Sequence, residues 1–191
     1  MIKTFTGPMH SGKTAEMISA YLKIWNKKNI RCFKPNCDTR DIGVMKSKDF
    51  HDGVPSIGID TFEEILNYID ESVRTIFIDE VQLMKGNIRV LTYLSVVKDI
   101  DIYTGGLNMT SEQDPFLVMP QILAISDEIE TVKASCYDCG RPASYTYYEG
   151  EKTAAVKVGD EGYIPLCSRC LLKRRGEEKL NKMLLKRKEE S

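Results

Sequence analysis

The sequence predicts an α/β fold in which a parallel sheet with flanking helices is followed by a small cysteine-bearing module. Short apolar segments alternate with segments of helical periodicity over residues 1–134, the order that builds a parallel sheet. A glycine-rich turn directly follows the first apolar segment, and two Cys-x-x-Cys pairs lie between residues 136 and 170. A length of 191 residues allows one main domain with an appendage.

Each element is predicted from its own pattern. Strands are expected at residues 2–5, 30–33, 75–78 and 100–104, and helices at residues 15–25, 62–69 and 87–97. Thr61, with Glu64 three residues later, is the expected N-cap of the second helix. The polar segment 36–60 lacks clear periodicity and is expected to be a functional or mobile loop. Residues 122–132 fit either a helix or a strand, with a last strand over 128–132 as one option.

The overall composition is that of a globular chain, with 42% hydrophobic and 29% charged residues. No apolar run approaches the roughly 20 residues of a membrane helix, and the first residues do not resemble a secretory signal. A net charge of −1 does not favour general nucleic-acid binding. We therefore expect a cytoplasmic protein with neither a membrane nor a nucleic-acid partner.

Residues 7–14 match the phosphate-binding pattern G-x-x-x-x-G-K-[ST] at every fixed position, between an expected strand and an expected helix. In such a loop, backbone N–H groups surround phosphate oxygens, the lysine adds positive charge and the last hydroxyl serves Mg²⁺. The main domain is thus expected to be P-loop NTPase-like and to bind ATP with Mg²⁺. The expected phosphate-binding residues are Gly7, Pro8, Met9, His10, Ser11, Gly12, Lys13 and Thr14.

Two adjacent carboxylates end the apolar strand at residues 75–78. Asp79 is expected to orient Mg²⁺, because carboxyl ends of parallel strands share one sheet edge with the phosphate loop. Side-chain alternation along the strand is expected to aim Glu80 differently, so that it can accept a proton from an attacking hydroxyl or water. Asp38 and Arg40 follow the second strand, where they either approach the metal's water shell and the phosphates or belong to a solvated turn.

The last four cysteines, Cys136, Cys139, Cys167 and Cys170, have the spacing of a closed structural Zn²⁺ site. Cys32 and Cys37 do not complete this pattern and are expected to be unpaired or buried thiols. The expected organisation is an α/β domain over residues 1–134, a zinc-ribbon-like domain over residues 135–171 and a charged tail over residues 172–191. The tail has eight basic and four acidic residues, which is typical of a solvated helix.

The order and spacing of these motifs, from about residue 2 to residue 170, resemble the type II, or cellular, thymidine kinase family. The matching segments are the phosphate loop, Lys34-Pro35 with Asp38-Thr39-Arg40, Asp79-Glu80-Val81-Gln82, Gly106-Leu107, Pro115-Phe116 and the four cysteines. The resemblance implies transfer of the γ-phosphate of ATP to the 5′-hydroxyl of thymidine or deoxyuridine, in nucleotide salvage for DNA synthesis. It also implies a homotetramer and feedback inhibition by the deoxynucleoside triphosphate.

The resemblance assigns residue roles by matching position. Glu80 is implied as the general base, while Gln82, Asp38 and Arg40 are implied to lie near the metal and phosphates. In this family the segment between the cysteine pairs closes over the base as a lasso. The implied nucleoside-binding residues are Met9, Leu83, Leu107, Phe116, Thr146, Val158, Gly159 and Tyr163.

The sequence departs from the family pattern around the base. Leu83-Met84 replaces two usual aromatic residues, Asn108-Met109-Thr110-Ser111 replaces Asp-x-Asp-Phe, and Val158-Gly159 replaces Gly-Gly. These changes leave the phosphate-binding residues intact and alter the base pocket. A nucleic-acid-binding ATPase with a zinc ribbon remains the alternative function, and a nucleotide-binding regulator without catalysis is a third.

Overall fold

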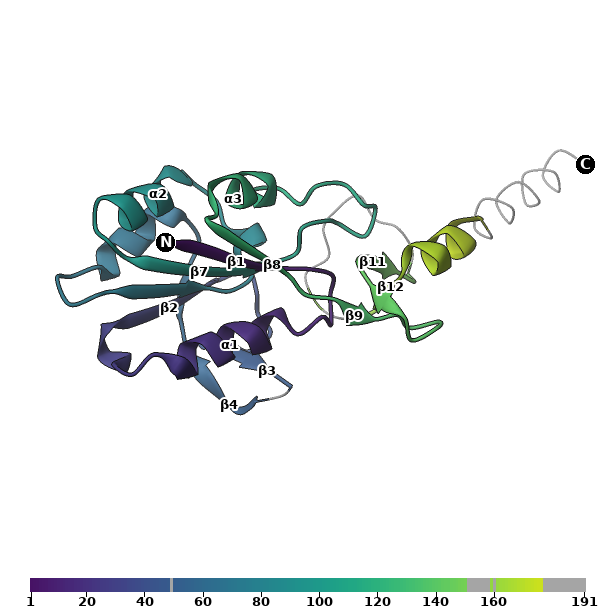
Figure 1. The fold of residues 1–191 in the computed structure, drawn as a ribbon, viewed down its shortest axis with the longest axis horizontal. Coiled ribbons are helices and arrows are strands. Elements are labelled where there is room, and N and C mark those ends of the chain that lie inside the picture. The colour runs from purple at the N-terminus through teal and green to yellow at the C-terminus, as the bar shows by residue number, and fades with distance from the viewer. Residues whose placement is uncertain (49, 151–158, 160, 177–191) are drawn as a thin grey trace, which may run out of the picture.

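The computed structural model describes residues 1–48, 50–150, 159 and 161–176. A main body with a central sheet lies at one end of the molecule, and a smaller module of short strands extends from one edge of that sheet (Figure 1). The described residues of the segment 134–176, here called the cysteine module, form this extension. The α/β fold class predicted from the sequence is confirmed.

The central sheet has six strands in the order β5-β2-β6-β7-β1-β8, and every neighbouring pair is parallel. Its strands are β1 (Ile2–Thr6), β2 (Ile30–Pro35), β5 (Ile57–Ile59), β6 (Thr75–Ile78), β7 (Asp101–Gly106) and β8 (Glu128–Thr131). Because all six run the same way, their carboxyl ends meet at the edge from which the cysteine module extends (Figure 1).

Helices cover both faces of the sheet. One face carries α1 (Lys13–Lys23) and a hairpin of β3 (Val44–Ser47) and β4 (Phe50–Pro55), and the other carries η2 (Phe62–Tyr68), α2 (Arg89–Val96) and α3 (Met119–Ile125). Short 3₁₀ turns η1 (Lys27–Asn29) and η3 (Val81–Leu83) precede β2 and follow β6. Alternation along β6 supplies both cores, because Phe77 packs with α1 whereas Ile76 and Ile78 pack on the opposite face.

The expected strands are all present, but the segment between β2 and η2 differs from the expectation of a loop. It contains β3, β4 and the edge strand β5. Met45 and Val54 of the hairpin are buried against α1. A few apolar residues in a polar segment are therefore enough to form a hairpin when a neighbouring helix covers them. Residues 122–132 divide into the end of α3 and β8.

The second expected helix forms as the 3₁₀ helix η2. Its N-terminus carries the expected capping box, in which Glu64 Oε1 accepts from the backbone N–H of Thr61 at 3.0 Å. Among the described residues, no helix combines the length and apolar character needed to cross a bilayer.

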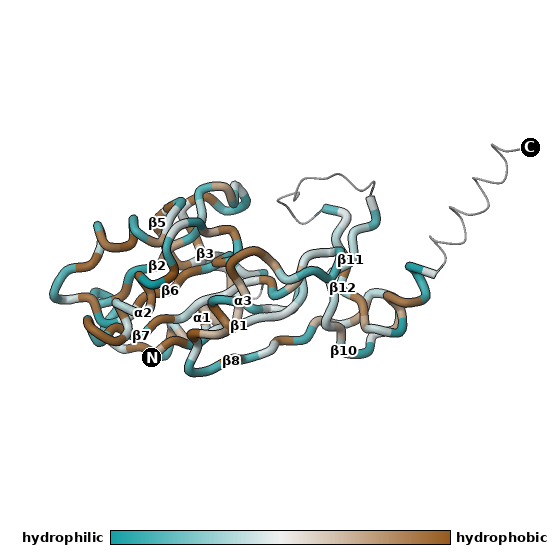
Figure 2. The backbone as a smooth tube through the Cα atoms, turned by 90° about the horizontal axis from the view of Figure 1, so that it is seen from above, coloured by the Kyte–Doolittle hydropathy of each residue, from teal (hydrophilic) through white to brown (hydrophobic). Residues whose placement is uncertain are grey.

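The cysteine module has its own small core. Its strands are β9 (Ala134–Ser135), β10 (Pro142–Ala143), β11 (Tyr145–Tyr148) and β12 (Tyr163–Leu166), and a helix covers residues 168–176. Ala143 and Leu166 are fully buried at its centre. Figure 2 shows the hydrophobic segments concentrated in the main body, which is consistent with a module that needs a further constraint besides its core.

Candidate active site

A cavity of about 1150 Å³ lies at the carboxyl edge of the sheet, between the strand ends and the cysteine module. Ligand sites of open α/β sheets occur at this edge, because the loops that follow the strands converge there. The structure brings most of the expected site residues together here. Those that line the cavity are Met9, His10, Ser11, Gly12, Lys13, Thr14, Asp38, Arg40, Asp79, Glu80, Gln82, Leu83, Leu107, Phe116, Thr146, Gly159 and Tyr163.

Three expected residues are not in that lining. Gly7 and Pro8 lie at the base of the phosphate loop, and Val158 lies outside the described residues. Gly7 has a packing role, because a Cβ there would lie 2.1 Å from the carbonyl oxygen of Val132. Only glycine therefore fits where the chain leaves β1 beside the residue that follows β8.

The phosphate loop is preformed around Lys13. The Lys13 side chain is buried, and its ammonium donates to the carbonyl of Pro8 at 2.7 Å, which holds the charge inside the loop. Gly12 precedes α1 with a left-handed φ of 87° and has no side chain to cap the helix. The first-turn N–H groups of α1, with the positive end of the helix dipole, therefore remain suited to an anion.

Asp79 and Thr14 form an oxygen-donor pair at the floor of the cavity. The Thr14 hydroxyl lies 3.3 Å from Asp79 Oδ2 and 3.4 Å from Oδ1. Burial, with a further contribution from the charge of Glu80, raises the pKa of Asp79 to about 7. A cation beside it would restore the ionised form. Carboxylate and hydroxyl oxygens suit a hard divalent cation, so the residues fit the expected Mg²⁺.

Glu80 is held from two sides. Its Oε1 accepts from Arg40 Nη2 at 2.7 Å, and its Oε2 accepts from Gln82 Nε2 at 2.6 Å. The two carboxylates do face different partners, as expected, but alternation along a strand is the wrong reason. β6 ends at Ile78, and Glu80 adopts a left-handed φ of 50° that turns the chain into η3.

Asp38 and Arg40 are ordered rather than parts of a solvated turn. Asp38 Oδ1 accepts from Arg40 Nε at 2.7 Å, and the Asp38 carboxylate is buried. Burial alone would raise the pKa of Asp38. Hydrogen bonds from Arg40 and Lys34 outweigh this effect and hold the pKa below its usual range. Lys34 also lines the cavity, and sequence reasoning missed it as a site residue. The available signal was its place at the carboxyl end of an expected strand.

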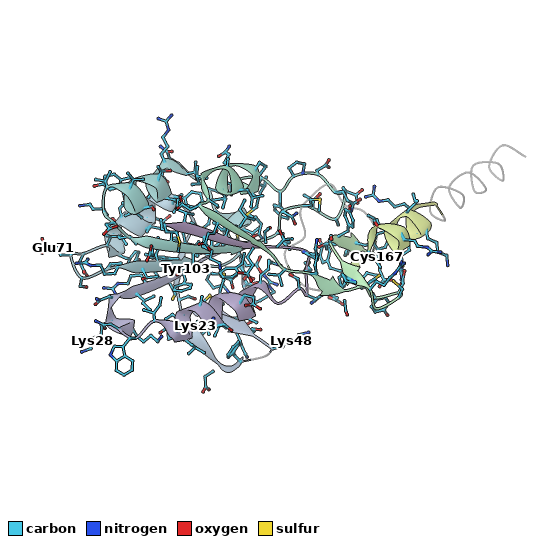
Figure 3. All side chains as sticks on the ribbon, in the orientation of Figure 1. Lys23, Lys28, Lys48, Glu71, Tyr103 and Cys167 are labelled. Atoms are coloured by element: carbon cyan, nitrogen blue, oxygen red, sulfur yellow. The ribbon has the colours of Figure 1, made fainter. Side chains whose placement is uncertain are left out.

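Two further segments line the cavity, and of these only residues 109–111 were expected near the base. One is the β3–β4 hairpin with Lys46, Ser47 and Lys48, the last of which is labelled in Figure 3. The other is the loop that follows β7, from Met109 to Asp114. Both segments follow strand ends at the carboxyl edge, and the strand order explains why they meet at the cavity.

The hairpin β11–β12 of the cysteine module lies directly on the phosphate loop. The backbone N–H of Met9 donates to Thr146 Oγ1 at 3.0 Å, and His10 Nε2 lies 3.2 Å from the carbonyl oxygen of Tyr163. The hydroxyl of Thr146, expected near the nucleobase, thus contacts the backbone of the loop. The module and the sheet edge therefore share one wall of the cavity.

The four cysteines of the module lie together, with all their Sγ atoms within 4.8 Å of one another. Cys139 and Cys167 Sγ are 3.7 Å apart, close to the roughly 3.8 Å expected between sulfurs on a tetrahedral Zn²⁺ with bonds of about 2.3 Å. Gly140 has the left-handed φ of 70° that the turn after the first pair requires. The residues therefore fit a structural zinc ion, and Figure 3 marks Cys167 in this cluster.

Arg141 supplies a cation beside the sulfurs. Its Nε lies 3.4 Å from Cys139 Sγ, and this contact lowers the pKa of Cys139 to about 6. A thiolate is the form that binds metal, so Arg141 favours the ligating state. Of the other two cysteines, Cys32 is buried, which raises its pKa to about 12, and Cys37 is exposed.

Comparisons with a family model and with the sequences of known proteins give matches to the same family. The thymidine kinase family model matches residues 1–171. A thymidine kinase of Pseudothermotoga lettingae is 34% identical over 170 residues, which covers 86% of this chain and 90% of the relative. A thymidine kinase of Bacteroides thetaiotaomicron is 33% identical over 180 residues, covering 93% of this chain and 89% of the relative.

Among solved structures, the Thermotoga maritima RuvB Holliday junction branch migration motor is similar with a TM-score of 0.35 and 18% identity. The likeness covers 69% of this chain and 37% of that chain. At this level of similarity it carries no argument about either fold or function.

Proposed function

The chain belongs to the thymidine kinase family, and we propose that Glu80 acts as the general base of its phosphoryl transfer. The function is that of a thymidine kinase, which transfers the γ-phosphate of ATP to the 5′-hydroxyl of thymidine. The family match selects this function over a nucleic-acid-binding ATPase. The observation that supports the assignment of the base is the carboxylate of Glu80, fixed by Arg40 and Gln82 in the cavity that the phosphate loop also lines.

In the proposed reaction, Glu80 accepts the proton of the 5′-hydroxyl while that oxygen attacks the γ-phosphorus. The bond between the γ-phosphorus and the β–γ bridging oxygen breaks, and ADP leaves with the bonding electrons. Lys13 and the N–H groups at the start of α1 stabilise the phosphoryl oxygens. Thr14 and Asp79 would hold Mg²⁺, which supplies charge neutralisation between the phosphates.

The nucleoside is proposed to lie between Leu83, Leu107 and Phe116 of the sheet edge and Tyr163 of the cysteine module. A module seated on the phosphate loop excludes water, so that the sugar hydroxyl rather than water attacks. Zinc bound to the four cysteines would fix the hairpin β11–β12 that carries Tyr163 and Thr146. Its role is structural, because all four ligands belong to the protein.

The family also suggests properties of the whole protein. We propose that it works in the cytoplasm as a homotetramer and takes part in nucleotide salvage. We also propose that it is inhibited by the deoxynucleoside triphosphate that is the end product of this salvage. The preferred base is to be measured directly with a panel of nucleosides, ATP and Mg²⁺. Thymidine or deoxyuridine is expected to give the highest kcat/KM.

The roles of the two carboxylates are separated by Glu80→Gln and Asp79→Asn. Glu80→Gln keeps the shape of the side chain but removes the proton acceptor, so turnover is expected to fall about 10²–10⁴-fold while ATP and thymidine still bind. Asp79→Asn is expected to raise the Mg²⁺ concentration needed for half-maximal rate, with recovery at high Mg²⁺. Normal turnover of Glu80→Gln refutes the assignment of the base, and rescue of Glu80→Gln by Mg²⁺ means that the roles are reversed.

A further inference from the structure

Lys34 is a buried cation that the proposed mechanism does not use. It lies near the carboxyl end of β2 and is 4% exposed. Its ammonium is 3.1 Å from Asp38 Oδ2 and 3.0 Å from the carbonyl oxygen of Asp41. Burying an ammonium costs several kcal/mol unless partners compensate. The Asp38 carboxylate and the Asp41 carbonyl supply these partners, and the ammonium in turn holds Asp38 in place.

Asp38 transmits the contact to Arg40. The carboxylate of Asp38 is buried, and beyond Lys34 it accepts from Arg40 Nε at 2.7 Å and from Arg40 Nη2 at 3.2 Å. This forked contact fixes the plane of the guanidinium. Because Lys34 anchors one oxygen of Asp38, the carboxylate cannot rotate to follow Arg40, and Arg40 must adopt the orientation that Asp38 dictates.

Arg40 in turn fixes Glu80. Its Nη2 also donates to Glu80 Oε1 at 2.7 Å, so four side chains of alternating charge run from β2 to the turn after β6. At the far end, Gln82 donates to Glu80 Oε2 and accepts from the backbone N–H of Leu107 at 3.2 Å. The Glu80 carboxylate is therefore held between β2 on one side and β7 on the other.

We infer that Lys34 is a positioning residue of the phosphoryl transfer, which sets the orientation of Glu80 through Asp38 and Arg40. The inference rests on the proposed role of Glu80. It differs from two other roles that Lys34 could have, a direct contact to phosphate and a purely structural neutralisation of Asp38. Its ammonium is already engaged by Asp38 and Asp41, which favours positioning over a phosphate contact.

The test is a double-mutant cycle of Lys34→Met, Asp38→Asn and both together. The measurements are kcat, KM for both substrates, Tm, and Kd for thymidine and for a non-hydrolysable ATP analogue. Lys34→Met is expected to lower kcat about 10- to 10²-fold, the cost of a misplaced reacting group, with both Kd values little changed. It is also expected to lower Tm, because Asp38 is left buried with one cation fewer.

The double variant is decisive. Replacing the buried pair by neutral groups is expected to recover Tm, while kcat stays at the level of the single variants because Arg40 has lost its anchor. If kcat recovers together with Tm, Lys34 is only structural. If Lys34→Met raises the Kd for the ATP analogue, and the losses in kcat/KM for ATP of the two single variants add up in the double variant, Lys34 contacts phosphate. Either outcome overturns the inference.

Two controls separate this inference from the proposed function. Lys3→Met removes another ion-paired lysine, 3.0 Å from Glu130 and outside the cavity lining, and is expected to leave kcat unchanged. Glu80→Gln is run in the same assay. If Glu80→Gln turns over normally, the base is misassigned. If kcat falls in Glu80→Gln but is normal in Lys34→Met, only the positioning role of Lys34 is refuted.

Discussion

The sheet edge and the cysteine module face the same cavity but hold their functional groups differently. The sheet edge uses side chains that lock one another in place, such as Asp38, Arg40 and Glu80, and these follow buried strands. The module contributes two short hairpins with a small core, and its contacts to the phosphate loop involve backbone groups of Met9 and Tyr163. In the proposed mechanism, the reacting groups thus belong to the part fixed by the large core, whereas the proposed enclosure of the nucleoside depends on the module and its few contacts to the phosphate loop.

The largest expected effect removes the charge of the phosphate loop. Lys13→Ala keeps the backbone of the loop but deletes the cation, so kcat is expected to fall at least about 10²–10³-fold, the usual cost of losing one electrostatic stabiliser. Lys23→Ala, at the exposed end of the same helix, is the matched control and is expected to turn over normally. Steady-state kinetics of both variants decide the matter. A Lys13→Ala enzyme within a few-fold of the parent would contradict the proposed role.

Removing a cysteine ligand tests whether the module serves the nucleoside rather than ATP. Cys167→Ser is expected to lower the zinc content and weaken thymidine binding about 10-fold or more, because the hairpin loses its tie. Binding of an ATP analogue is expected to persist, since the phosphate loop belongs to the main body. The exposed Cys37→Ser is the control. Full thymidine affinity in zinc-free parent protein would show that the module does not depend on metal.

The contact between the two regions is tested at Thr146. Thr146→Val keeps the shape but removes the acceptor for the Met9 N–H, a net loss of about 1 kcal/mol or about fivefold in affinity. The loss is expected in thymidine binding measured with the ATP analogue present, because both regions are then engaged. Thr146→Ser retains the hydroxyl and should behave as the parent does. Equal thymidine affinities of Thr146→Val and Thr146→Ser would show that this hydrogen bond does not contribute to binding.

The smallest expected effect concerns the surface of the module. Arg174 donates to Asp138 at 2.6 Å and to Glu149 at 2.6 Å, and these partly exposed pairs are worth less than about 1 kcal/mol. Arg174→Gln is expected to lower Tm slightly without changing kcat.

The stabilisation from the pair of Arg174 and Asp138 depends on pH in a defined direction. The hydrogen bond from Arg174 lowers the pKa of Asp138, so the stabilisation is present above the unfolded pKa of about 3.9 and is lost as pH falls through the lower folded value. The Tm difference between parent and Arg174→Gln should therefore shrink in acid. A difference that grows on acidification would contradict the assignment.

The contrast between the regions also explains what could be predicted from the sequence. Lys13, Glu80 and each pair of cysteines occur in short local motifs, so their presence in the site could be predicted from residue spacing. The tie from Lys34 to Asp38 was not predicted, because it depends on how the chain turns after β2. The contact of Thr146 with Met9 joins residues 137 positions apart, and no local pattern encodes it.

Two local expectations failed for physical reasons. The β3–β4 hairpin was expected to be loop, because its buried Met45 and Val54 acquire a partner only when α1 packs over them. The orientation of Glu80 was attributed to strand alternation, yet it follows from a left-handed backbone at that residue. Both depend on tertiary context rather than on periodicity.

The close approach of Gly7 to Val132 has a consequence for any attempt to reduce the molecule to a minimal nucleotide-binding unit. Val132 follows β8 on the path to the cysteine module, and its carbonyl occupies the space where a Cβ of residue 7 would lie. The backbone N–H of Val132 donates to the carbonyl of Thr6 at 2.8 Å, so the loop and the connecting segment share one junction. A chain truncated at residue 131 would lose this junction and its hydrogen bond to Thr6, the residue directly before the phosphate loop. The boundary of a self-sufficient fragment therefore falls beyond the last strand of the sheet.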